Sequence, residues 1–326
     1  MKKHRLLKLV AAGAITAGAI YAYNQYVRST AAKQGRLPAD INDFYESSQG
    51  KLHYTKTGPA GGTPLILLHT LDPMSSSAEW ENILPRLAAD RPVYLLDLLG
   101  CGRSEKRRAL TTNFIHVKAI QEFIRDMVTE GTPDIAAAGL SCEVALMLAA
   151  YAPDAVHELI LINPPAVTRD PYAVSWKEKA LASILSTPLI GEFIYNLLYS
   201  RSAIDKKLSE ISFYNPFRDN DSYLGACYES AHLGDGHGRF LLASLVSHYL
   251  NMDCAHAISV LDHKALILSG EALEGAHFAA RSWSELNSKI TAKSITHTRG
   301  LPHVEAPEKT ADAMRAFLAG ADAASS

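Results

Sequence analysis

Cysteine is scarce in this chain, because only four of the 326 residues are cysteines. Four are too few for the disulfide framework of a small secreted domain, and their spacing does not fit a metal site. We therefore expect free thiols and predict no metal centre. The four residues are Cys101, Cys142, Cys227 and Cys254.

Net charge is also small, at −2 with histidine counted as neutral. Outside the N-terminus the chain has no basic run, so nothing indicates a nucleic-acid partner. Internal repeats are absent as well. The apolar share of 48% and the charged share of 20% are typical of a globular protein, and the length allows one large domain with an insertion.

The N-terminus departs from this pattern, because a charge-free run extends from Leu9 to Val27. As a helix the run is about 28 Å long, close to the hydrocarbon thickness of a bilayer. Tyrosines gather at its far end, as they do at membrane interfaces. We expect residues 1–28 to form one transmembrane anchor, followed by a polar linker over 29–48. The basic residues before the run are Lys2, Lys3, Arg5 and Lys8.

These basic residues slightly outnumber those after the run, which favours an extracytoplasmic body. The alternative is a cleaved signal peptide and a secreted protein. Its cleavage site at 17–19 would fall inside the apolar run, which favours the uncleaved anchor.

Beyond residue 48, short apolar strands alternate with helical patterns, which predicts a mostly parallel sheet with helices on both faces. The rhythm stops over 166–259, a helical and aromatic-rich interval that we interpret as an inserted lid. The sheet core then comprises 49–165 and 260–320, with a disordered tail over 321–326. Strands are expected at 51–56, 64–69, 93–97, 134–139, 157–162, 265–269 and 293–298, and helices at 78–88, 113–129, 279–287 and 307–318.

Four segments, in this order, resemble the α/β-hydrolase superfamily. The segment from His69 to Trp80 is similar to an oxyanion-loop motif, H-G-x-x-G…W. Residues 97–104 match the turn D-x-x-G-x-G-x-S, and residues 139–143 resemble the nucleophile elbow G-x-S-x-G. Residues 301–308, LPHVEAPE, resemble the closing motif. The resemblance implies an eight-stranded α/β-hydrolase fold with an inserted helical lid.

The resemblance identifies Ser141 as the candidate nucleophile at a sharp strand-to-helix turn. The N–H of Cys142, with Thr70 or Leu71, would form the oxyanion hole. Two features depart from the family pattern. Glu143 stands where the elbow has its second glycine, and the residues at 70 and 71 are larger than usual.

The other two members of the catalytic triad are displaced. Gly300 stands at the position of the catalytic histidine, and Leu273 at that of the acid. His303 is therefore the candidate base and Glu274 the candidate acid. The alternatives are His297 for the base and Glu271 for the acid, and loop carboxylates in solvent are the simpler interpretation of both glutamates.

Two functions follow from this pattern. The first is a serine hydrolase with a rearranged triad that acts on a small acyl ester or thioester and needs no cofactor. The second is a catalytically inactive, hydrolase-like binding or scaffold protein. The hydrolase is the leading interpretation, and the binding protein is the alternative.

Overall fold

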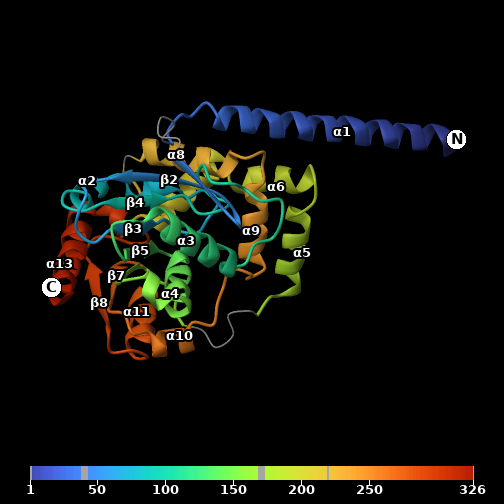
Figure 1. Ribbon diagram of the computed structural model, residues 1–326. Helices are drawn as coiled ribbons and strands as arrows, with labels where there is room; N and C mark the ends of the chain where they lie inside the picture. The colour runs from blue at the N-terminus through green and yellow to red at the C-terminus, as the bar shows by residue number, and fades with distance from the viewer. Residues whose placement is uncertain (1, 38–42, 168–172, 219, 326) are drawn as a thin grey trace.

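The structure is a computed structural model, and it describes residues 2–37, 43–167, 173–218 and 220–325 (Figure 1). Eight strands form one sheet in the order β1-β2-β4-β3-β5-β6-β7-β8. Strand β2 pairs antiparallel with β1 and β4, and the remaining pairs are parallel. The predicted mostly parallel, eight-stranded sheet is confirmed. The strands are β1 Asp43–Ser47, β2 Gly50–Thr57, β3 Leu65–Leu68, β4 Val93–Leu96, β5 Asp134–Ala138, β6 Leu159–Ile162, β7 Ala265–Gly270 and β8 Ile290–Ile295.

Helices cover both faces of the sheet, which explains why the central strands are continuous apolar runs. The helices α3 (Asn113–Met127), α4 (Ser141–Tyr151), α10 (Ala255–Val260) and α11 (Ala276–Ser284) contribute to the core on one face. On the other face lie α2 (Leu84–Leu87), α13 (Pro307–Ser325) and the 3₁₀ turns around Trp80. The short elements η1 (Ser77–Trp80), η2 (Pro153–Ala155) and α12 (Pro302–Glu305) complete this part of the fold.

Two predicted boundaries change. Strand β1 lies inside the segment 29–48 that was predicted as linker, and 38–42 of that segment are outside the described residues. This edge strand is short and carries charged residues, so its pattern does not read as a buried strand. At the other end, α13 continues through Ser325, where a disordered tail was predicted.

Between β6 and β7 the described residues contain helices and no strand, in the interval predicted as the lid. Tyrosine and phenylalanine side chains form much of the lid's own apolar core. The lid consists of α5 Trp176–Leu185, α6 Ile190–Leu198, α7 Arg201–Lys207, the π-helical turn η3 Leu208–Ser212, α8 Asp221–His232 and α9 Gly238–Val246.

The N-terminal helix α1, Lys2–Ala31, projects from the body as one long rod (Figure 1). Its last turns pack into the lid, where Val27 and Ala31 join the apolar core. Within the described part of the chain, no single helix is long and apolar enough to cross a membrane. Helices α5 and α6 meet that criterion only together, and they are bent by 109° relative to each other.

Candidate functional site

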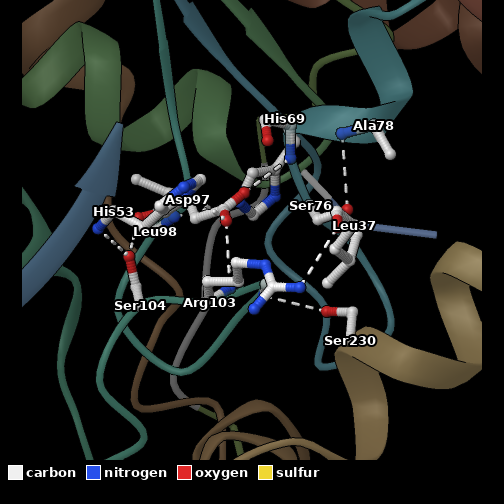
Figure 2. Close-up of polar contacts among 12 residues, drawn as sticks. Leu37, His53, His69, Ser76, Ala78, Asp97, Leu98, Arg103, Ser104 and Ser230 are labelled. Carbon is white, nitrogen blue, oxygen red and sulfur yellow. Dashed lines mark hydrogen bonds and ion pairs between the residues drawn. The ribbon is translucent and has the colours of Figure 1, made fainter. Parts of the chain in front are cut away.

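The turn over 97–104 is buried and organises the carboxyl end of β4. Asp97 Oδ1 accepts a hydrogen bond from the Ser77 N–H at 2.7 Å, and Asp97 Oδ2 accepts from the Arg103 N–H and from His53 Nδ1, both at 2.9 Å. Figure 2 shows His53 and Arg103 beside the Asp97 carboxylate. Burial alone would raise the pKa of Asp97, but the His53 hydrogen bond and the other donors hold it well below its usual value.

Gly102 and His69 fix the neighbouring loop in place. A Cβ at Gly102 would lie 2.3 Å from the Asp97 carboxylate, so only glycine fits there. His69 Nε2 accepts from the Leu98 N–H at 2.9 Å, and its Nδ1 donates to the Thr70 carbonyl at 2.7 Å (Figure 2). Both ring nitrogens are therefore engaged in holding the backbone.

A cavity of about 210 Å³ lies above the carboxyl ends of the strands, where α/β folds place their ligands. Its wall includes Gly139 after β5, Leu273 after β7 and Gly300 after β8. The loop after β3 adds Thr70, and the lid adds Lys207. The cavity thus gathers the loops to which the family resemblance assigns catalysis.

Gly139 is the corner of the strand-to-helix turn. It follows β5 directly and adopts φ +56°, the left-handed conformation that glycine adopts readily. In a nucleophile elbow, the residue at this strained corner carries the nucleophile. The resemblance placed Ser141 at this corner, whereas the structure places Ser141 two residues beyond it.

Ser141 instead lies in the first turn of α4 and is fully buried. Its hydroxyl donates to the His69 carbonyl at 2.6 Å, which ties α4 to the loop after β3. Among the described residues, the cavity lining includes Gly139 and does not include Ser141. A small side chain at 141 lets helix and loop approach closely.

The positions that the resemblance assigns to the acid and the base do face the cavity, and they hold Leu273 and Gly300. The Gly300 N–H donates to the Ser212 carbonyl of η3 at 2.8 Å. A Cβ at Gly300 would lie 3.1 Å from that carbonyl oxygen. The lid therefore packs against the place where a histidine side chain would begin.

His303, the candidate base, is fully buried behind the cavity wall, which includes its partner Glu79 and not His303 itself among the described residues. Its ring stacks on Trp80, with ring centroids 4.5 Å apart, and its Nε2 lies 3.4 Å from Glu79 Oε2. Burial alone would raise the pKa of Glu79, but His303 holds it below its usual value. The pair joins the closing loop to the 3₁₀ turn and does not contact Ser141 within the described contacts.

The remaining candidates for acid and base are exposed. Glu274 and Glu271 lie on the surface of the loop after β7, and Glu271 accepts from the His297 N–H at 3.3 Å. The His297 ring lies against Tyr214, with ring centroids 5.7 Å apart. The structure does not bring these residues together with Ser141.

The predicted oxyanion donors are engaged elsewhere. The Cys142 N–H donates to the Gly139 carbonyl at 3.1 Å, and the Thr70 N–H donates to Glu79 Oε2 at 2.9 Å. Leu71 is buried beside Thr70. Because the corner is Gly139, the N–H that follows it belongs to Leu140, a residue that the sequence analysis did not single out.

The charged wall of the cavity was also missed, because it joins the loop after β3 to the distant lid. Lys207 Nζ donates to Asp72 Oδ2 at 2.7 Å, and the Tyr199 hydroxyl donates to Asp72 Oδ1 at 3.1 Å. Burial alone would raise the pKa of Asp72, but Lys207 holds it below its usual value, and Asp72 in turn raises the pKa of Lys207.

Glu143 points into a second cavity, of about 220 Å³, on the far side of Leu140. Its carboxylate accepts from the Met252 N–H at 3.0 Å. Burial raises the pKa of Glu143 from 4.5 to about 7. Its charge is therefore partly lost at neutral pH.

The comparisons with known proteins agree with this fold. Residues 63–203 match the family described as alpha/beta hydrolase fold. Over 129 residues the chain is 33% identical to a haloalkane dehalogenase of Mycobacterium marinum (strain ATCC BAA-535 / M), which covers 38% of this chain and 42% of the relative. Over 126 residues it is 25% identical to a 2-hydroxy-6-oxo-6-(2'-aminophenyl)hexa-2,4-dienoic acid hydrolase of Metapseudomonas resinovorans, which covers 38% and 43%.

Solved structures extend the likeness over nearly the whole chain. A serine hydrolase involved in carbazole degradation has a TM-score of 0.70 at 19% identity, covering 86% of this chain and 99% of that one. A membrane phospholipase A has a TM-score of 0.68 at 20% identity and covers 98% of this chain and 99% of that one. The chain therefore has the α/β-hydrolase fold, and its residues 63–203 match the α/β-hydrolase family. It spans less than half the length of the two curated relatives, both of which are hydrolases by name.

Proposed function

We propose that this protein is a hydrolase-fold binding protein, whose cavity holds a small ligand without hydrolysing it. One observation carries the proposal. Gly139, Leu273 and Gly300 stand around a single cavity, at the positions of nucleophile, acid and base. None of these side chains can attack a carbonyl carbon or transfer a proton.

The neighbours of the two glycines support the same proposal. A Cβ at Gly139 would lie 3.0 Å from Thr70 Cγ2, so the methyl group of Thr70 occupies the room of a nucleophile. Ser212 crowds Gly300 in the same way. Restoring catalysis would therefore require a smaller residue at 70 and a small shift of the lid backbone at Ser212, as well as the triad residues.

The side chains that line the cavity indicate the chemical class of its ligand. Leu273, Ile211 and Leu301 give an apolar surface, and the Asp72–Lys207 ion pair lies on the same wall. An apolar body with one hydrogen-bond acceptor, such as a short acyl ester or thioester, suits this combination. Such a ligand needs no cofactor for binding.

A second candidate is an acyl hydrolase that acts through Ser141. The hydrolase names of the curated relatives favour it. Catalysis by this route requires the Ser141 hydroxyl to break its hydrogen bond to the His69 carbonyl. The His303 ring would also have to break its contact with Glu79 and move to Ser141. The same route would also require Glu274 to turn inward from the surface.

A fluorophosphonate probe on the purified full chain separates the two candidates. We expect no labelling, and the same result for Ser141→Ala. Labelling that disappears in Ser141→Ala would establish the hydrolase instead.

Binding is tested with short-chain acyl esters as ligands, measured by thermal shift together with a product assay. We expect stabilisation without product. Ile211→Trp, which narrows the cavity from the lid, should abolish the shift. Ile184→Trp, on the lid surface away from the cavity lining, is the matched control. Equal shifts in both variants would place the ligand elsewhere.

We also propose that α1 attaches the protein to a membrane. The charge-free run from Leu9 to Val27 and the basic residues before it support this attachment. Retention of the full chain in the membrane fraction after a high-salt wash is the expected result. Release into the soluble fraction would contradict it.

A further inference from the structure

Helix α6 of the lid buries polar side chains and exposes apolar ones, which is the reverse of an ordinary surface helix. Amphipathic helices bury their apolar stripe and expose polar residues. In α6 the polar residues Glu192 and Asn196 are buried, while Ile190, Leu197 and Leu198 are 53%, 48% and 50% exposed. The helix therefore presents its apolar side outward.

Helix α1 explains why the polar side faces inward. Arg28 donates to both oxygens of Glu192, each at 2.7 Å. Asn196 Nδ2 donates to Asn24 Oδ1 at 3.0 Å, and Asn24 Nδ2 donates to the Leu189 carbonyl at 3.2 Å. The polar contacts fix α6 to α1 in one orientation, so the outward direction of its apolar side is set by the structure.

The apolar surface continues onto the neighbouring helix. Ile184 of α5 is 42% exposed and precedes the turn into α6. We call Ile184, Ile190, Leu197 and Leu198 the lid apolar face. Lys177 and Lys179 are exposed on α5, and α1 projects past α6 and α5 on the same side of the molecule (Figure 1).

We propose that the lid apolar face docks on a lipid bilayer, with acyl chains covering Ile190, Leu197 and Leu198. A bilayer accounts for an apolar helix side, for a projecting helix next to it with a charge-free run from Leu9 to Val27, and for lysines nearby that suit anionic headgroups. The proposal is independent of whether the cavity turns over its ligand. It adds a second membrane contact to α1 and thereby fixes the orientation of the lid.

The test uses the full chain and vesicles of phosphatidylcholine and phosphatidylglycerol with brominated acyl chains. Trp80 and Trp283 are buried, so a background of Trp176→Phe leaves little exposed tryptophan. In that background, Leu197→Trp places an indole on the lid apolar face. Val260→Trp, at a position that is 57% exposed on α10 at the other side of the body, is the matched control (Figure 1).

We expect the bromines to quench Leu197→Trp and to leave Val260→Trp unchanged. The double substitution Ile190→Glu with Leu197→Glu should lower vesicle partitioning by about tenfold or more, because two apolar side chains leave the acyl region. Val260→Glu should leave partitioning unchanged.

Three results would overturn the proposal. Vesicle-bound protein with equal, weak quenching at both positions would mean that α1 alone contacts lipid. Failure of the full chain to float with vesicles would exclude both contacts. A concentration-dependent dimer in sedimentation that Leu197→Glu dissolves would assign the face to a second copy of the chain.

Discussion

The turn over 97–104 after β4 and the corner at Gly139 after β5 lie at the same edge of the sheet, but their residues make different contacts. In the turn over 97–104, a buried carboxylate is saturated with donors and a glycine is required by sterics. At the corner after β5, Gly139 presents no side chain to the cavity. The first turn is held by these buried contacts, whereas the second presents no reactive side chain. A chain can therefore keep the fold while the catalytic positions are emptied.

The largest expected effect is on the first turn. Asp97→Ala would leave the Ser77 and Arg103 N–H groups and His53 without their acceptor, and should cost about 3–5 kcal/mol of unfolding free energy. Urea denaturation measures it. Glu274→Ala, on the exposed loop, is the control and should change stability by less than about 0.5 kcal/mol. A loss at Asp97 as small as the control would show that this turn is not a folding element.

The next largest effect is expected from restoring a catalytic triad around the corner at Gly139. The combined variant Thr70→Gly, Gly139→Ser, Leu273→Asp and Gly300→His supplies a triad and removes the methyl group that crowds the corner. We expect esterase activity at least about a hundredfold above that of the natural chain, the scale of general-base catalysis. The same variant with Gly300 retained is the control. A folded but inactive combined variant would show that the lid or the oxyanion loop also blocks the reaction.

A smaller effect concerns Glu143, beside the corner. Its pKa is raised from 4.5 to about 7 in the folded protein, so between these values only the folded state keeps the proton. The contribution of this residue to stability therefore falls as pH rises from about 4.5 to about 7, by on the order of 2 kcal/mol. Glu143→Gln should flatten this part of the stability profile in thermal unfolding. An unchanged profile would mean that the carboxyl is solvated.

The smallest expected effect is that of Ser141→Ala, which tests whether Ser141 has a structural role or is a nucleophile. Ser141→Ala removes the hydrogen bond to the His69 carbonyl and should cost about 1 kcal/mol of stability. Ligand binding in the cavity should persist, because Ser141 does not line it within the described residues. Loss of ligand binding at unchanged stability would be the contrary result.

The sequence predicted the sheet and its interrupted rhythm well, because strands buried on both faces read as apolar runs. It also predicted Leu273 and Gly300 as substitutions at the acid and base positions. The sequence aligned Ser141 with the serine of the elbow motif, whereas the left-handed corner lies two residues earlier, where β5 ends. A left-handed residue is required there, and Gly139 was the available signal.

Other features depend on contacts between distant segments. The pairing of His303 with Glu79 joins the closing loop to the turn after β3, and the Asp72–Lys207 pair joins that loop to the lid. No spacing within one segment predicts either contact. The same holds for β1, because an edge strand needs only one neighbour and one buried side.

The hold of Arg28 on Glu192 has a mechanical consequence. Near the beginning of α6, Glu192 is bound by Arg28 of α1. Just after the end of α6, the Tyr199 hydroxyl donates a hydrogen bond to Asp72 in the cavity wall. A tilt of α1 would therefore be transmitted through α6 to the cavity wall by two hydrogen-bonded pairs, Arg28–Glu192 and Tyr199–Asp72. A movement at the projecting end of α1 would in this way reach the wall of the cavity.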